Sequence, residues 1–202
     1  MKPPSFDNSY ARLPAQFFEP VIPDHAPNPK LIVHNSALAR EIGFDSAWLH
    51  SKAGLAMISG QKMPNSANPI AMVYGGHQFG HWSGRLGDGR ACLLGEIVGP
   101  DNIRRDIVLK GSGPTPYSRR GDGKSELGPV LREYIVSEAM AAYGVPTTRA
   151  LAALTTGENV VRGETLPGGV LVRVAKSHVR VGTFQHFYAD RDIDGLKTLT
   201  DY

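Results

Sequence analysis

Residues 91–110, ACLLGEIVGPDNIRRDIVLK, contain two short apolar runs separated by a strong turn signal. The first run covers 91–98 and the second covers 103–110, and the four residues GPDN between them are typical of a tight turn. Two β-rich runs joined in this way predict an antiparallel hairpin. Lys110 ends the second strand and is followed at once by the glycine-rich sequence GSGP.

A helix is predicted further along the chain, after a polar, basic loop at 114–128. Gly128 can cap this helix, Pro129 suits its first position, and residues 130–143 continue it before Gly144 and Pro146. Strand-like runs follow at 147–154, 159–162 and 169–175, with turn signals at 156–159 and 167–169. The order of hairpin, helix and further strands predicts an α+β fold with a mainly antiparallel sheet, rather than a doubly wound fold.

The remaining segments are assigned by their prolines, caps and apolar spacing. Residues 1–30 are rich in proline and are expected to form an extended arm, and residues 31–202 are expected to form one lobe. Two short helices are predicted within 35–60, and an amphipathic segment is predicted at 193–202. The expected arm anchors are Phe6, Tyr10, Phe17 and Phe18, and the expected helix caps are Asn35 and Asp45.

Composition excludes several classes of protein. The 202 residues are 41% hydrophobic and 20% charged, values near globular averages, which excludes a disordered tail. No apolar run approaches the length of a membrane span, and the first residues lack a signal or transit pattern, so a cytoplasmic protein is expected. The single cysteine, Cys92, cannot form an internal disulfide. Its apolar neighbours predict a buried strand thiol, with a reactive thiol as the alternative.

Positive charge is concentrated in two stretches of the chain. Residues 104–132 carry a net charge of +4 and residues 160–180 carry +3, although the whole chain carries only +3. Such stretches indicate an anionic ligand. The basic residues alternate with glycine and proline rather than with aromatic residues, which favours a small phosphate ligand over nucleic acid.

Lys110 and Glu133 form a candidate functional pair. Glu133 shares a mostly apolar face of the predicted helix, so its carboxylate needs a positive partner. A strand lysine paired with a helix glutamate, near a glycine-rich hairpin, is the arrangement with which kinases hold nucleotide phosphates. Two alternatives stay open from spacing alone: Lys110 is a solvated charge, or Glu133 pairs with an arginine and is structural.

Three other patterns in the sequence are candidates for ligand binding. The sequence GDGR at 87–90 and GSG at 111–113 could bring backbone N–H groups close to phosphate, or could mark ordinary turns. Arg173 and Arg180 could bind phosphate in a bidentate manner, or could be surface charges. His77 and His81 have a zinc-like spacing only on a helix, and the surrounding glycines argue against a helix there.

The motifs together resemble the selenoprotein O family. The segments that carry the resemblance are YGGHQFG at 74–80, LGDGR at 86–90, LKGSG at 109–113, TPYSR at 115–119, GDG at 121–123, REY at 132–134, GVPTTRA at 144–150, VRVA at 172–175 and SHVR at 177–180. The resemblance covers roughly residues 6–202. It implies the amino-terminal lobe of a protein-kinase-like fold that transfers AMP, or UMP, from the nucleoside triphosphate to Ser, Thr or Tyr hydroxyls of proteins.

The resemblance also implies roles for individual residues, with the nucleotide reversed relative to ordinary kinases. Lys110 would bind phosphate and pair with Glu133, while Arg173 and Arg180 would hold phosphates in the reversed pose. The implied ATP-binding residues are Gly87, Gly89, Arg90, Lys110, Asp122, Gly123, Arg173 and Arg180.

Family members are longer than this chain, so the resemblance places part of the machinery elsewhere. The catalytic Asp and the Asn and Asp that hold Mg²⁺, or Mn²⁺, are expected beyond Tyr202. No catalytic or metal-ligating residue is therefore expected here, and Asp190, Asp192 and Asp194 are interpreted as a solvated turn. The expected partners are ATP and protein substrates, with no nucleic acid, no membrane and a monomeric state. The alternative is an ATP-binding module without catalysis, and isolated residues 1–202 are expected to be inactive.

Overall fold

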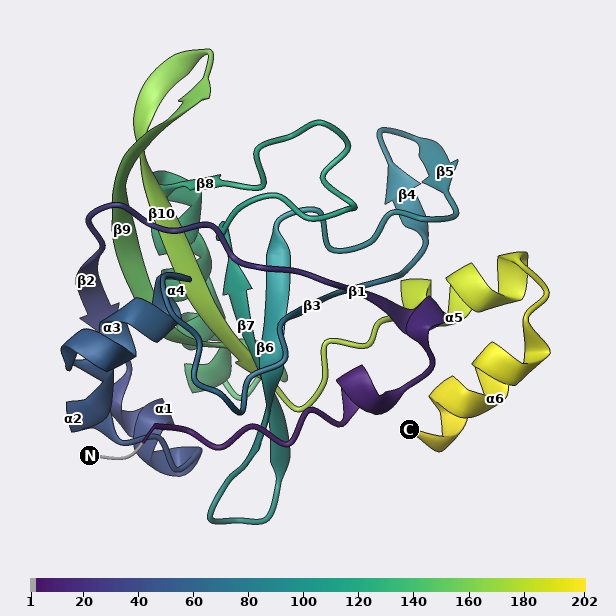
Figure 1. The fold of residues 1–202 in the computed structure, drawn as a ribbon, viewed down its shortest axis with the longest axis horizontal. Helices are drawn as coiled ribbons and strands as arrows, with labels where there is room; N and C mark the ends of the chain where they lie inside the picture. The colour runs from purple at the N-terminus through teal and green to yellow at the C-terminus, as the bar shows by residue number, and fades with distance from the viewer. Residues whose placement is uncertain (1–2) are drawn as a thin grey trace.

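A mainly antiparallel sheet forms the centre of the computed structural model, which describes residues 3–202 (Figure 1). Its strands lie in the order β1-β3-β6-β7-β10-β9-β2, and β8 pairs with β10. Their bounds are β1 (Phe18–Pro20), β2 (Lys30–His34), β3 (Ile70–Met72), β6 (Ala91–Val98), β7 (Arg104–Lys110), β8 (Ser125–Glu126), β9 (Arg149–Arg162) and β10 (Glu164–Ala175). A separate small hairpin pairs β4 (Gly76–Gln78) with β5 (His81–Ser83).

Six α-helices and two 3-10 turns complete the described part of the chain. They are η1 (Tyr10–Arg12), η2 (Ala15–Phe17), α1 (Ser36–Glu41), α2 (Ser46–Leu49), α3 (Lys52–Ile58), α4 (Leu127–Ala142), α5 (Val181–Ala189) and α6 (Ile193–Asp201). None of the helices within residues 3–202 combines the length and apolar character that crossing a bilayer requires. The predicted α+β class with a mainly antiparallel sheet is confirmed, and the architecture is consistent with a kinase-like lobe.

Alternation along the central strands divides the core between the two faces of the sheet. On β7, Ile107 and Leu109 belong to a cluster with α1, α2 and α3, whereas Val108 faces the opposite side. That opposite side is covered by α4 near β9 and β10, and by α5 and α6 near β3 (Figure 1). Lys110 lies two residues beyond Val108, so its side chain projects on the α4 side of the sheet. The strand pattern therefore sets the face on which the lysine lies.

The predicted hairpin at 91–110 is confirmed. Strands β6 and β7 pair antiparallel from Ala91 opposite Lys110 to Val98 opposite Arg104. Asn102 takes a positive φ of 58° in the turn, a backbone conformation that asparagine tolerates better than most residues. Cys92 is buried on β6 as predicted, and burial raises the pKa of its thiol, so the reactive-thiol alternative is not supported.

Helix α4 exists as predicted but begins earlier than its sequence signals indicated. Its N-cap is Glu126 and its first residue is Leu127, so the assignment of Gly128 as the cap was wrong. Gly144 follows the helix with a φ of 76°, which confirms its role in ending it. Glu133 faces the sheet, as its helix position predicted, and pairs there with Lys110 and Arg173. This helix face is less buried than expected, because within α4 only Val130 is buried and the Glu133 side chain keeps 29% exposure.

The predicted turns near 156–159 and 167–169 were wrong, because both positions lie within the long hairpin of β9 and β10. Both strands run through these positions, and the chain reverses at Gly163, whose φ is 84°. Gly157 has a φ of 81° within β9, and the pairing register shifts between Pro167 and Gly169. The glycine and proline residues therefore produce irregularities inside strands rather than connections between them.

The amino-terminal region is less extended than expected. It contains η1, η2 and the edge strand β1; Phe6, Tyr10 and Phe17 are buried, and Phe18 is half-buried. Met1 and Lys2, which begin the predicted arm, lie outside the described residues.

The structure contains more helices than the sequence predicted. Three helices, rather than two, occupy 36–58, and α5 was not predicted. The caps were predicted correctly, because Asn35 accepts a hydrogen bond from the Leu38 N–H and Asp45 accepts from the Ala47 N–H. The amphipathic segment at the end of the chain forms α6 as predicted.

Candidate functional site

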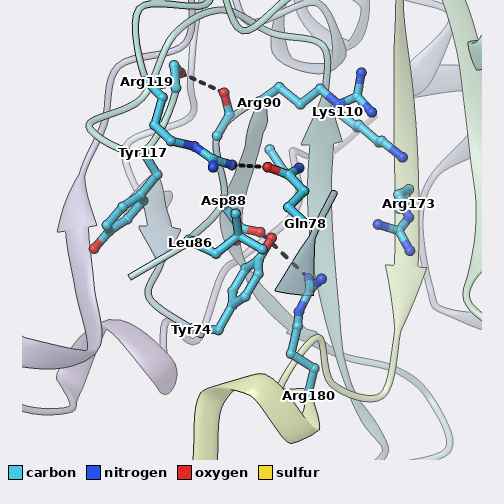
Figure 2. A pocket seen from close by; sticks show the side chains of 14 residues that line it. Tyr74, Gln78, Leu86, Asp88, Arg90, Lys110, Tyr117, Arg119, Arg173 and Arg180 are labelled. Atoms are coloured by element: carbon cyan, nitrogen blue, oxygen red, sulfur yellow. Dashed lines mark hydrogen bonds and ion pairs between the residues drawn. The ribbon is translucent and has the colours of Figure 1, made fainter. Parts of the chain in front are cut away.

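A cavity of about 470 Å³ opens where β6, β7 and β10 meet the β4–β5 hairpin and the loop after β7 (Figure 2). Its volume lies within the range typical of small-molecule sites. Its lining residues are Tyr74, Gln78, Leu86, Gly87, Asp88, Gly89, Arg90, Ala91, Lys110, Tyr117, Ser118, Arg119, Arg173 and Arg180.

Positive charge dominates this lining, which carries five basic residues and, among the described residues, a single acidic one, Asp88. Burial lowers the pKa of Lys110, and burial likewise lowers the pKa of Arg173, because water is removed from their charged forms. An anion entering the cavity would add negative charge beside these partly desolvated groups. The electrostatics therefore favour a ligand with several negative charges.

Glu133 of α4 contacts two of the cavity cations. Lys110 donates a hydrogen bond from Nζ to Glu133 Oε2, and Arg173 Nε lies 3.1 Å from Oε1 of the same carboxylate. Arg173 also donates from Nη2 to Thr148 Oγ1 at 3.0 Å. The Lys110–Glu133 pair is brought together as predicted, and the alternative arginine partner is present as well. One carboxylate thus holds two cations side by side on the cavity wall.

Arg180 is held from two directions at the other side of the cavity (Figure 2). Its guanidinium carbon lies 4.1 Å from the centre of the Tyr74 ring, which is cation–π geometry. Its Nη2 lies 3.6 Å from Asp88 Oδ1. The Asp88 side chain is only 7% exposed, and burial raises the pKa of this carboxyl although Arg180 and the Met72 N–H partly oppose the shift.

The glycines at 87 and 89 line the cavity, but their backbone N–H groups are used within the protein. The Gly87 N–H donates to the Tyr74 carbonyl, and the Gly89 N–H donates to the Gly87 carbonyl. A Cβ on Gly87 would lie 2.2 Å from the Tyr117 ring, and one on Gly89 would lie 2.8 Å from the Tyr117 carbonyl oxygen. Packing against Tyr117 therefore explains both glycines. The positive charge that this cavity offers to an anion therefore comes from side chains rather than from these backbone N–H groups.

The GSG segment at 111–113 is likewise engaged with the protein. The Gly111 N–H donates to the Arg90 carbonyl at 2.8 Å, and the Gly113 N–H donates to the Gly123 carbonyl at 3.3 Å. Ser112 accepts at its carbonyl from the Asp24 N–H. These bonds anchor the base of the loop that covers the cavity, which favours the structural interpretation of this segment over a phosphate cradle.

Asp122 and Gly123 do not contribute to the cavity lining as the structure describes it. Asp122 accepts from Arg162 Nη2 at 2.6 Å and Nη1 at 2.9 Å, and this hydrogen bonding lowers the pKa of its carboxyl. Gly123 packs against Gly113 at the base of the loop, whose other end places Arg119 over the cavity. The structure thus gathers six of the eight predicted ATP-binding residues and places these two outside.

Sequence reasoning gave no role to several lining residues. Tyr74, Gln78, Tyr117 and Arg119 all lie within motifs quoted for the resemblance, and Arg119 donates from Nη2 to Gln78 Oε1 at 2.7 Å. That bond joins the loop after β7 to the β4–β5 hairpin (Figure 2). The sequence signal that could have identified them is the presence of aromatic and amide residues inside glycine-rich motifs. Their spacing along the chain alone does not show that they line one cavity.

The other candidate ligand residues have local structural roles. His77 and His81 lie on opposite strands of the β4–β5 hairpin, which excludes the helical zinc arrangement. Asp192 caps α6 by accepting from the Gly195 N–H, and Asp190 ends α5. Across residues 3–202 the structure brings together no group of three or more His, Cys, Asp or Glu side chains that could hold a metal.

Comparison with known proteins gives consistent matches over almost the whole chain. Residues 3–202 match the family model described as protein adenylyltransferase SelO. Relatives include proteins named protein nucleotidyltransferase YdiU from Methylorubrum extorquens, 60% identical, from Alkalilimnicola ehrlichii, 59% identical, and from Bacillus cytotoxicus, 57% identical. Each match covers 98% of this chain and 39–40% of the relative. The chain therefore spans about 40% of the length of these curated relatives.

Proposed function

Because this chain belongs to the SelO family of protein adenylyltransferases, we propose that its cavity binds the triphosphate of ATP for nucleotidyl transfer. The observation that carries the proposal is the five-cation lining of the cavity, in which Lys110 and Arg173 are both partly desolvated. A triphosphate carries several negative charges on a compact group, so it matches this lining better than a neutral ligand does.

In the proposed reaction, a Ser, Thr or Tyr hydroxyl of a protein attacks the α-phosphorus of ATP. The bond from this phosphorus to the bridging oxygen breaks, AMP becomes attached to the protein, and pyrophosphate leaves. UMP transfer from UTP follows the same course. The cavity cations would stabilise the charge that develops on the pyrophosphate, since they are already oriented before the nucleotide binds. The group that takes the hydroxyl proton is proposed to lie beyond Tyr202.

A divalent metal does not fit the described residues on their own. The single acidic side chain of the cavity lining, Asp88, is buried and faces Arg180, and it accepts from the Met72 N–H at 3.2 Å. Mg²⁺ and Mn²⁺ prefer several oxygen ligands. We therefore propose that Mg²⁺, or Mn²⁺, is held by residues outside this chain segment.

A second candidate is an ATP-binding module without chemistry. It is favoured by the same feature, since the cavity offers cations to phosphate but no free carboxylate within residues 3–202 to act as a base. The two candidates predict the same nucleotide affinity and differ only in turnover by the whole protein. Residues 1–202 alone are proposed to bind ATP without transferring AMP.

The test uses the whole protein with ATP labelled at either the α- or the γ-phosphate. Label on protein from the α-position alone is expected, and label from the γ-position alone would contradict the proposal and indicate phosphorylation. Lys110→Met should abolish labelling and weaken ATP binding. The matched control is Lys197→Met, which removes the same charge from an exposed position on α6 and should leave both unchanged.

A further inference from the structure

Asp88 is an unexpected residue in a site for an anion. Its side chain is almost fully buried, it lines the cavity, and its charge has the same sign as the proposed ligand. A buried carboxylate costs stability unless its interactions offset the loss of water. Its neighbours explain what it can do there: Arg180 Nη2 lies 3.6 Å from Asp88 Oδ1, and the Tyr74 ring lies 4.1 Å from the guanidinium carbon of the same arginine.

We propose that Asp88 is a positioning residue, which together with the Tyr74 ring holds the Arg180 guanidinium toward the phosphates of the bound nucleotide. This role rests on the proposed function, because it requires that the cavity bind ATP. Asp88 itself would not touch the phosphates. It would act by reducing the number of conformations that Arg180 samples before the nucleotide arrives.

The geometry supports such a role because Asp88 is fixed more firmly than the arginine. The Asp88 N–H donates to the Met72 carbonyl at 3.0 Å, and Asp88 Oδ2 accepts from the Met72 N–H at 3.2 Å. Thr115 donates from Oγ1 to the Asp88 carbonyl at 2.6 Å. Arg180, in contrast, caps the start of α5 and keeps 42% side-chain exposure. A rigid carboxylate therefore anchors a long and otherwise mobile side chain.

Tyr74 completes the restraint from a second direction. The guanidinium carbon of Arg180 lies 4.1 Å from the centre of the Tyr74 ring, so the ring restricts the orientations of the guanidinium plane. Asp88 attracts one edge of the same guanidinium group. An unrestrained arginine loses side-chain entropy when a ligand immobilises it. Restraint before the nucleotide binds removes part of that loss from the binding step.

Asp88→Asn separates this role from a simple charge effect, because the two predict opposite signs. Removing a negative charge from the wall of an anion site should tighten ATP binding if Asp88 is only a background charge. If Asp88 positions Arg180, the same substitution should weaken ATP binding, since Asn holds a guanidinium less firmly. Asn keeps the size of the side chain and an oxygen that can accept from the Met72 N–H.

The experiment measures the dissociation constants of ATP and adenosine by titration calorimetry on the whole protein. We expect Asp88→Asn to weaken ATP binding about tenfold, the change that corresponds to about 1.4 kcal/mol, and to leave adenosine binding unchanged. In an Arg180→Ala background, Asp88→Asn should no longer weaken ATP binding. Asp194→Asn, an exposed change of the same net charge, is the matched control and should have no effect.

Unchanged or tighter ATP binding by Asp88→Asn would overturn the positioning role while leaving the proposed function intact. Equal losses with and without Arg180 would overturn it too, because the effect would not pass through the arginine. If the wild-type protein bound no ATP, the proposed function would fail and this role with it. Should Asp88→Asn not fold, Tyr74→Leu tests the same restraint: it should weaken ATP but not adenosine, and equal affinities for ATP would overturn the role.

Discussion

Glu133→Gln tests the junction between α4 and the cavity wall most directly. The substitution keeps the length and volume of the side chain but removes the charge that Lys110 and Arg173 share. Two cations on neighbouring strands would then face each other without a counter-charge. We expect the free energy of unfolding to fall by about 2 kcal/mol at neutral pH.

That magnitude follows from the exposure of the three side chains. Lys110 keeps 24% exposure, Glu133 keeps 29% and Arg173 keeps 19%, so the cluster is neither at the surface nor fully buried. An exposed ion pair contributes up to about 1 kcal/mol, and removing one partner of a fully buried pair costs about 3–5 kcal/mol. An intermediate exposure places the expected loss between these limits, at about 2 kcal/mol.

Urea unfolding followed by tryptophan fluorescence measures this loss, since the two tryptophans include the buried Trp48. The matched control is Glu164→Gln at an exposed position of β10, which should change the free energy of unfolding by less than about 0.5 kcal/mol. At equal concentrations, ATP should stabilise Glu133→Gln less than it stabilises wild type, because Lys110 and Arg173 would no longer be oriented for phosphate. A loss no larger than that of the control would refute the shared-carboxylate argument.

The remaining predictions concern two residues near the cavity. Gly123→Ala should lower the free energy of unfolding by more than about 1 kcal/mol, because φ is 64° and the new Cβ would lie 1.9 Å from the Gly113 carbonyl oxygen. The control Gly128→Ala, whose Cβ meets open space in α4, should instead raise the free energy of unfolding. Equal shifts in melting temperature for the two variants would contradict this prediction. Asp88→Asn should have a higher free energy of unfolding than wild type at pH 7. Burial raises the pKa of Asp88 above 3.8, so ionising this carboxyl costs wild-type stability as the pH rises from 3.8 through the folded pKa. Below pH 3.8 the carboxyl is protonated in both the folded and unfolded states, and the difference from Asp88→Asn should disappear. Unfolding measured against pH checks this, and a gap that widened toward low pH would rule it out.

Local signals in the sequence predicted the parts of the fold that depend on neighbouring residues. The hairpin at 91–110 follows from two apolar runs and one turn, and the caps at Asn35 and Asp45 follow from short-range side-chain bonds. The same local rules failed at 156–159 and 167–169. There, glycine and proline lie within a long pair of strands whose pairing was decided by distant partners, and the chain accommodates them as irregularities.

The site was predictable where a motif already joined its residues, and unpredictable where strand register joined them. Spacing and resemblance predicted the Lys110–Glu133 pair, and resemblance placed Arg173 at the phosphates. The contact of Arg173 with Glu133 was not predicted, because it depends on β10 pairing with β7. Leu171 lies opposite Lys110 in that register, so Arg173, two residues along, reaches the same face of the sheet and the same carboxylate. No short-range pattern in the sequence encodes that register.

Four of the five cavity cations are restrained by other side chains of the protein. Glu133 holds Lys110 and Arg173, Gln78 holds Arg119, and Asp88 with Tyr74 holds Arg180. Because the restraints come from α4, from the β4–β5 hairpin and from the loop before β6, the mutual repulsion of the cations is offset by separate elements rather than by the ligand. A glycine-rich phosphate loop would instead rely on backbone N–H groups, which are engaged here at 87 and 89. Substitutions at the restraining residues should therefore reduce phosphate binding as strongly as substitutions at the cations themselves.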